Sequence, residues 1–110
     1  DGAHNPEGVR WLVDHLPPAD YTVVASILAD KDVEAMLRVL ATTARRFVAC
    51  TSSNPRALSA AELAARAGAH FDHVEAVPEP RAALARGHEL GKPVLVTGSL
   101  YLLGDLEAPA

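Results

Sequence analysis

Four short strand-like runs, separated by stretches with helical spacing, constrain the fold of this chain more than any other feature. The runs read YTVVASIL (21–28), RFVAC (46–50), HVEAV (73–77) and KPVLVTG (92–98). Strands that alternate with helices of about 10–15 residues are typical of β-α-β units. Runs such as PVLV and TVVASIL have no polar face, which favours a parallel sheet covered by helices on both sides. The pattern therefore predicts an α/β domain with a mostly parallel sheet.

The stretches between these runs carry the start signals of helices. Asn5 is a suitable N-cap before Pro6, and a pair of prolines at 17–18 ends the first helix. Ser59 and Glu62 form the pattern of a capping box. Apolar residues recur at helical spacing at Val9, Leu12, Val13 and Leu16 in the first stretch and at Val33, Met36, Leu37 and Leu40 in the second.

Two further helices are expected towards the end of the chain. Pro80 opens a helix that continues through RAALARGHEL. The last segment, SLYLLGDL, is predicted to form a short helix that turns Leu100, Leu103 and Leu106 inward. The whole order starts with a helix, whereas a right-handed crossover begins from a strand. We therefore expect the first strand of the sheet to lie upstream of Asp1.

Composition limits the classes of function that are open to the chain. Its 110 residues are enough for one domain, spanning residues 1–110. The formal net charge of −4 leaves no basic stripe for nucleic-acid binding. The lone Cys50 excludes an internal disulfide and fits a reducing cytoplasm. No apolar run approaches the roughly 20 residues that span a bilayer, so we expect no membrane partner and a cytoplasmic location.

The polar loops that follow the predicted strands are the best candidates for a binding site. In open parallel sheets, ligands bind where the carboxyl ends of the strands lead into helices. The loops of this type read DGAHN, after the expected upstream strand, then LADKD, TSSNPR and TGSLY. Because these loops converge on one edge of a sheet, they predict one shared site.

Each candidate residue in these loops also has an ordinary structural interpretation. Asp1 and His4 could contact a nucleotide, or they could merely flank the Asn5 cap. Lys31 could neutralise a carboxylate or phosphate, or lie in solvent at a helix start. Arg56 suits bidentate carboxylate recognition but also fits a simple turn. Ser99 could present N–H groups to an anion, or serve as an N-cap.

Several motifs of nucleotide-binding proteins are missing from the chain. There is no G-x-x-x-x-G-K-[ST] loop and no G-x-G-x-x-G pattern. The histidines show no metal-ligand spacing. The chain therefore cannot bind a triphosphate and Mg²⁺ unaided, and an enzyme containing it would draw the rest of its site from another domain.

Four segments in order, DGAHNPEG, ILADKDVEAML, NPRALSAAELA and VLVTGSLYLLGDL, resemble one known family. They are similar to the C-terminal domain of folylpolyglutamate synthase/dihydrofolate synthase, within the Mur ligase superfamily. The resemblance covers nearly the whole chain and is weakest over residues 69–90. It implies a Rossmann-like three-layer sandwich behind an N-terminal P-loop ATPase domain, which is absent from this chain. It also implies an ATP-dependent carboxylate–amine ligase, with the isolated domain inactive.

The resemblance also assigns roles to individual residues. Asp1 matches the aspartate that contacts the ATP ribose, and His4 matches the histidine at the nucleotide and acyl-phosphate side, a catalytic position. Asn5 completes this nucleotide-binding group. The positions that match the pocket for the incoming amino acid are Lys31, Arg56, Ser99 and, beside them, Tyr101.

The family's chemistry supplies the expected substrates and cofactors. ATP phosphorylates a carboxylate of dihydropteroate or of a reduced folate such as tetrahydrofolate, and the amine of L-glutamate attacks the acyl phosphate. Mg²⁺ and K⁺ assist, with the Mg²⁺ ligands mainly in the absent ATPase domain. The full-length protein is expected to be a monomer in which this domain packs against its own ATPase domain.

Two other functions remain open from the sequence. A cell-wall Mur ligase domain would share AHNP but should lack the GSLYLLGD ending. A non-catalytic α/β nucleotide-binding module is the third possibility. Its receiver-like form needs a phosphorylatable aspartate at a strand end, where this chain has IL, AC and VTG.

Overall fold

A computed structural model describes residues 5–98 and 100–107 of the chain. Helices and strands alternate along it, in the following order: α1 (Pro6–His15), β1 (Tyr21–Ala25), α2 (Val33–Leu40), β2 (Ala44–Ala49), α3 (Ala60–Ala67), β3 (His73–Ala76), α4 (Pro80–Leu90), β4 (Val94–Thr97) and α5 (Leu100–Glu107). The predicted alternation is confirmed.

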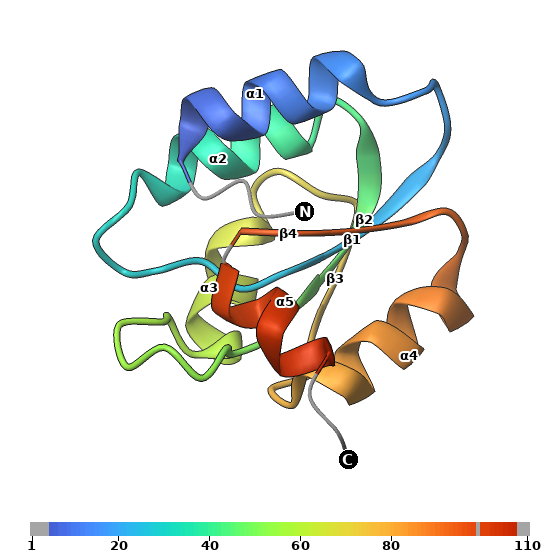
Figure 1. Cartoon of the computed structure of the whole chain (residues 1–110). Coiled ribbons are helices and arrows are strands. Elements are labelled where there is room, and N and C mark those ends of the chain that lie inside the picture. Colours follow the sequence, from blue (N-terminus) through green and yellow to red (C-terminus); the bar gives the residue numbers. More distant parts are fainter. Residues whose placement is uncertain (1–4, 99, 108–110) are drawn as a thin grey trace.

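The strands form one parallel sheet in the order β3-β2-β1-β4. Val23 in the middle of β1 pairs with Phe47 of β2 on one side and with Leu95 of β4 on the other. Because all four strands run the same way, their carboxyl ends lie along a single edge (Figure 1). The expected convergence of the loops at that edge follows directly from this topology.

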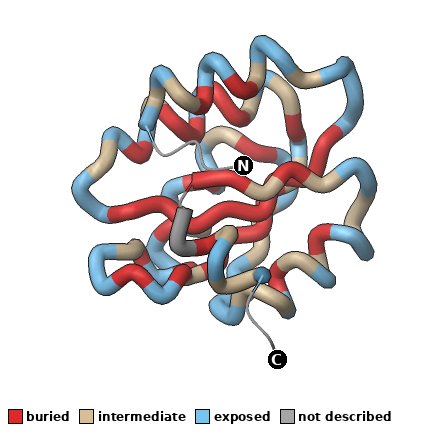
Figure 2. Tube along the Cα trace, viewed as in Figure 1, coloured by how far each residue is buried: buried red, intermediate tan, exposed pale blue. Residues whose placement is uncertain are grey.

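Helices cover both faces of the sheet, which gives three layers (Figure 1). Alternate residues of each strand point to opposite faces. Val23 and Phe47 pack with α1, α2 and α3, whereas Val24 and Val48 pack with α4 and α5. The central strands β1 and β2 are mostly buried (Figure 2), whereas the edge strand β3 is intermediate to exposed. The α/β three-layer sandwich predicted from the sequence is therefore confirmed.

Side chains that satisfy free N–H groups mark the starts of four helices. The Asn5 Oδ1 atom accepts from the Gly8 N–H at 2.7 Å, and the Ser59 hydroxyl accepts from the Glu62 N–H at 3.1 Å. Both caps were predicted. Asp32 caps α2, and Glu79 caps α4 by accepting from two backbone N–H groups. Each such cap contributes about 1 kcal/mol to helix stability.

Two details of the elements differ from the sequence prediction. The first strand ends at Ala25 rather than at residue 28, because Leu28 instead forms an isolated antiparallel bridge with Ala57. In α5, Leu102 is fully buried and Leu106 packs behind it, four residues later on the same helical face. The prediction that Leu103 points inward is therefore wrong: the buried residue is its neighbour, Leu102.

An ion-pair cluster fastens the edge strand β3 to α4. Arg86 of α4 donates from Nε and Nη2 to the two carboxylate oxygens of Glu75, at 2.7 and 2.8 Å. His73 contacts the same carboxylate at 2.6 Å. These hydrogen bonds, Arg86 first and His73 second, lower the pKa of Glu75 to about 2. The cluster holds the strand in place where only one neighbouring strand pairs with it.

The outer surface of α1 carries one large apolar side chain. Trp11 is 62% exposed and stacks on His15, with the ring centroids 4.0 Å apart and 19° between the planes. The His15 Nδ1 atom lies 2.7 Å from the Trp11 carbonyl oxygen. No helix in the described part of the chain is long and apolar enough to cross a membrane.

Candidate functional site at the carboxyl edge of the sheet

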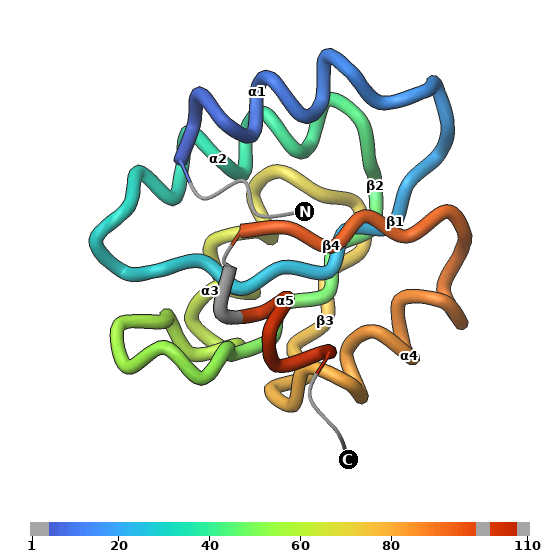
Figure 3. The backbone as a smooth tube through the Cα atoms, in the orientation of Figure 1, coloured from blue at the N-terminus to red at the C-terminus, as the bar shows by residue number. Residues whose placement is uncertain are grey.

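Loops from all four strands meet at the carboxyl edge of the sheet. The first described residues of α1 lie on the same side (Figure 3). In this region the described residues are Asn5, the segments 26–32, 50–59 and 77–79, and Gly98. Helices α2 to α5 also begin at this edge, because each of them follows the carboxyl end of a strand in the parallel sheet.

The loops after β1 and β2 are joined by backbone hydrogen bonds. The Ala29 N–H donates to the Arg56 carbonyl at 2.8 Å, and the Leu58 N–H donates to the Ile27 carbonyl at 3.0 Å. These bonds flank the antiparallel bridge between Leu28 and Ala57. The two loops that carry Lys31 and Arg56 are therefore a single ordered unit.

Buried polar side chains support this unit from beneath. The Asn54 Oδ1 atom accepts from the Arg56 N–H at 2.9 Å, and the Ser52 N–H donates to the Ser26 hydroxyl at 2.9 Å. Asn54 and both serines are buried. No buried side-chain nitrogen or oxygen in the described residues lacks a hydrogen-bond partner. The loop under Arg56 is thus fully satisfied internally.

Arg56 itself extends to the surface and forms an ion pair across the two loops. Its Nη1 atom lies 2.7 Å from the Oδ2 atom of Asp30, and the two side chains are 62% and 49% exposed. Lys31, which follows Asp30 in the chain, is half-buried. Its side chain makes no hydrogen bond or ion pair with the described part of the chain. Two cationic groups therefore emerge from adjacent loops at this edge.

The end of β4 comes unusually close to the loop after β1. Gly98 has a φ of +106°, and a Cβ atom at this position would lie 2.4 Å from the Ser26 carbonyl oxygen. A glycine is therefore required both by the backbone conformation and by the close approach. This turn precedes Ser99, which lies outside the described residues.

Asp105 of α5 ties the last helix to the loop after β2. Its carboxylate accepts from the Ser53 N–H at 2.8 Å and from the Ser53 hydroxyl at 2.7 Å. A cavity of about 330 Å³ lies beside this contact. It is lined by Thr51, Ser52, Ser53, Glu79, Pro80 and Asp105. The segment after β4 and the segment that carries Arg56 are thereby connected.

The remaining predicted residues are only partly described. Asp1 and His4 lie outside the described residues. Asn5 uses its side-chain oxygen to cap α1, which is the structural role weighed from the sequence. Tyr101 belongs to α5, but its side chain is outside the described part of the structure.

Cys50, directly after β2, has a structural role. Its thiol is fully buried and donates to the Ala25 carbonyl at 3.5 Å. Burial, reinforced by the charges of Asp105 and Glu79, raises the pKa of the thiol to about 12. The thiol is therefore a poor nucleophile at neutral pH.

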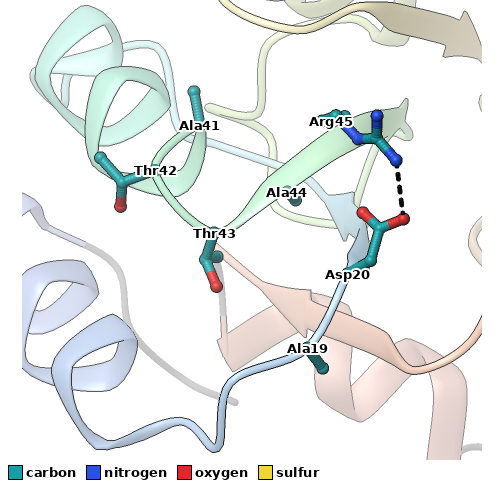
Figure 4. Close-up of a pocket in the computed structure, with 7 residues that line it drawn as sticks. All are labelled: Ala19, Asp20, Ala41, Thr42, Thr43, Ala44 and Arg45. Atoms are coloured by element: carbon teal, nitrogen blue, oxygen red, sulfur yellow. Dashed lines mark hydrogen bonds and ion pairs between the residues drawn. The ribbon is translucent and has the colours of Figure 1, made fainter.

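The opposite, amino edge of the sheet is organised around charged side chains (Figure 4). Arg46 donates to the Thr22 hydroxyl at 2.7 Å, to the Asp20 carbonyl at 2.9 Å and to the Asp20 carboxylate at 3.0 Å. Arg45 reaches the same carboxylate at 3.1 Å. These arginines lower the pKa of Asp20. A cavity of about 400 Å³ lies next to this group.

The chain matches a known family of domains over most of its length. Residues 1–100 match the family model described as Mur ligase, glutamate ligase domain. The chain belongs to this family.

Known relatives of this glutamate ligase domain are folylpolyglutamate synthases. The folylpolyglutamate synthase of Lacticaseibacillus casei is 35% identical over 106 residues, covering 93% of this chain and 24% of the relative. That of Mycobacterium tuberculosis, complexed with ADP, is 30% identical with a TM-score of 0.86, covering 94% of this chain and 27% of that chain. The chain thus spans about a quarter of the length of these relatives.

A third relative is named for two activities. It is the bifunctional folylpolyglutamate synthase/dihydrofolate synthase of Yersinia pestis, complexed with AMPPNP and a Mn ion. It is 26% identical, with a TM-score of 0.79, and the match covers 94% of this chain and 26% of that chain. Both of these solved relatives are complexed with an adenine nucleotide, ADP in one and AMPPNP in the other.

The structure brings together two residues that the sequence singled out, Lys31 and Arg56, on bridged loops. Sequence reasoning missed Asp30 and Asp105, the acidic partners of these loops. Both pair with residues distant in sequence, by 26 and 52 positions, so no local spacing signals them. For Asp30, its position next to Lys31 in the sequence was the available clue.

Proposed function

We propose that this glutamate ligase domain is part of an ATP-dependent ligase that adds L-glutamate to dihydropteroate or to a folate. The observation that carries the proposal is the 35% identity to a folylpolyglutamate synthase across 93% of the chain. A cell-wall Mur ligase domain or a non-catalytic nucleotide-binding module has no comparable support among these relatives. We place the full-length protein in the cytoplasm, as a monomer in which this domain packs against its own ATPase domain.

Two cationic side chains on the loops at the carboxyl edge fit the proposed amino-acid substrate. L-glutamate carries two carboxylates, which need two separated cationic or N–H donor sites. Arg56 offers a guanidinium fork and Lys31 offers an ammonium point charge, from adjacent loops. We assign these two residues, with Ser99 and Tyr101 beside them, to the glutamate pocket.

Asp1, His4 and Asn5 are assigned to the nucleotide side of the same edge. ATP would supply the phosphoryl group that converts the substrate carboxylate into an acyl phosphate. The glutamate amine must be neutral to attack, so a nearby anion such as Asp1 would accept its proton. The amide bond forms as the bond to phosphate breaks and phosphate leaves. This chain contributes mainly by holding the amine in line with the acyl carbon.

Mg²⁺ and K⁺ belong to the proposal only through the rest of the protein. Among the described residues, no group of three or more His, Cys, Asp or Glu side chains could hold a metal ion. By the family resemblance, we assign the Mg²⁺ ligands mainly to the ATPase domain.

The test uses the full-length enzyme and glutamate-dependent ATP hydrolysis. Arg56→Ala should raise the KM for glutamate about 10- to 100-fold, because a charge-assisted contact to a carboxylate is removed. The KM for ATP should stay the same. Arg66→Ala, at an exposed arginine of α3, is the matched control. An unchanged glutamate KM in Arg56→Ala would remove Arg56 from the pocket, and ATP hydrolysis that ignores glutamate would overturn the proposal.

A further inference from the structure

The ion pair between Asp30 and Arg56 uses only one corner of the guanidinium. Nη1 donates to the Asp30 carboxylate at 2.7 Å. The Nε and Nη2 atoms make no hydrogen bond with any described residue. The Nε–Nη2 edge is one of the edges of an arginine that can bind a carboxylate through two parallel N–H bonds. Among the described residues, Arg56 is therefore held at one corner and keeps one edge without a partner.

The backbone of the two loops places these side chains opposite each other. The Ala29 N–H, next to Asp30, donates to the Arg56 carbonyl at 2.8 Å. The Arg56 N–H in turn donates to the buried Asn54 side chain at 2.9 Å. The backbone at both ends of the ion pair is thus anchored, and less backbone freedom is lost when the pair forms than in a pair on free loops.

The pair has little to contribute to folding. Its side chains are 62% and 49% exposed, and exposed ion pairs contribute about 0–1 kcal/mol to stability. An arginine at the surface of the candidate pocket nevertheless needs a defined direction to bind a carboxylate through two bonds. The role that the geometry favours for Asp30 is therefore to orient the guanidinium group of Arg56.

We propose that Asp30 is a positioning residue that fixes the Nε–Nη2 edge of Arg56 for the carboxylate of the incoming amino acid. This inference rests on the proposed function and names a residue that acts through Arg56 without touching the substrate. The alternative is that Asp30 competes with the substrate: its carboxylate would pair with Arg56 until the carboxylate of the amino acid displaces it. The two arrangements predict opposite changes in the KM for glutamate.

The experiment measures steady-state kinetics of the full-length enzyme with Asp30→Ala and Asp30→Asn. Asp30→Ala should raise the KM for glutamate about tenfold, while kcat and the KM for ATP change by less than about twofold. Asp30→Asn keeps an oxygen acceptor for Nη1 and should show a smaller rise. Glu89→Gln removes an exposed carboxylate that lies 3.5 Å from Arg86 of α4, and serves as the charge-matched control.

A lower KM for glutamate in Asp30→Ala would overturn the proposal and favour displacement of Asp30 by the substrate. An unchanged KM would show that Asp30 does not position Arg56. Arg56→Ala separates these results from failure of the proposed function. If Arg56→Ala raises the KM and Asp30→Ala does not, only the positioning role fails. In an Arg56→Ala background, Asp30→Ala should have no additional effect on the KM. Equal thermal midpoints of the variants verify that each one folds.

Discussion

The two edges of the sheet are stabilised by different kinds of interaction. At the carboxyl edge, backbone bonds and buried hydroxyl groups join the loops, as in the contact of Ser52 with Ser26. At the amino edge, one half-buried arginine, Arg46, links Asp20 and Thr22 through its side chain. The carboxyl edge is thus ordered by backbone and buried polar contacts, and Arg56 keeps its Nε–Nη2 edge without a partner among the described residues.

Together with the proposed function, this difference predicts that the two edges contribute differently to stability and to binding. At the amino edge the guanidinium groups are used for internal contacts, so a change there should affect folding alone. At the carboxyl edge the internal contacts are made by small polar groups and glycine, and Arg56 keeps one edge without a described partner. A change in the supporting groups there should alter binding as well.

The largest expected effect is at Gly98, the tightest point of the carboxyl edge. Gly98→Ala should lower the free energy of unfolding by about 2–5 kcal/mol, because the methyl group meets the Ser26 carbonyl and φ is +106°. Urea unfolding followed by far-UV circular dichroism measures this change.

Gly104 is the matched control for this substitution. It lies within α5, and a Cβ atom there would meet nothing within 4 Å. Gly104→Ala should stabilise the domain by up to about 1 kcal/mol through helix propensity. Equal effects at the two glycines would contradict the close approach described for Gly98.

Two single substitutions, one at each edge, test whether stability and binding are separated. Arg46→Ala should cost about 1–3 kcal/mol of stability, since it leaves the buried Thr22 hydroxyl without this donor, and should not change the glutamate KM. Asp105→Ala should cost about 1–2 kcal/mol, because Ser53 loses two hydrogen bonds. It should also raise the glutamate KM, because the loop that carries Arg56 is loosened.

Two measurements check this pair. Urea unfolding gives the stability of each variant, and steady-state kinetics of the full-length enzyme give the KM. The rate at which thiol reagents label the buried Cys50 reports opening of the carboxyl edge, and should increase in Asp105→Ala. A larger change in the KM for glutamate in Arg46→Ala than in Asp105→Ala would contradict the proposed difference between the two edges.

The smallest effect concerns pH at the amino edge. Arg45 and Arg46 lower the pKa of Asp20 from its ordinary 3.8 in the folded state. The contribution of Asp20 to stability is therefore present above pH 3.8 and is lost as the pH falls below it. Asp20→Asn should be less stable than the parent at pH 6, and this difference should narrow below pH 3.8. A difference that stays constant between pH 6 and pH 3 would exclude the titration of Asp20 as its cause.

Most of the fold could be predicted because each element carries local signals. Proline and cap residues mark the starts of helices, as at Asn5 and Ser59, and β-rich runs mark the strands. The end of β1 was placed too late because residues 26–28 are as apolar as the strand itself. Their departure from the sheet depends on the bridge to Ala57, a contact that no local pattern encodes.

The candidate site was predictable only at the level of loops. Parallel strands place Lys31 and Arg56 at one edge, and the topology confirms that arrangement. Their roles in binding glutamate, like those of Asp1, His4, Ser99 and Tyr101, stay predictions. The pairing of Arg56 with Asp30 could not be foreseen, because it depends on the register between two loops rather than on either sequence.

The stacked pair on α1 has a practical consequence for spectroscopy. Trp11 is the single tryptophan of the chain, and its indole lies mostly in solvent against the imidazole of His15. Because the indole already lies in solvent, its emission should report burial of the core poorly, and should respond instead to any surface that covers α1. An intrinsic-fluorescence signal from this domain is a reporter of one helix face rather than of the core.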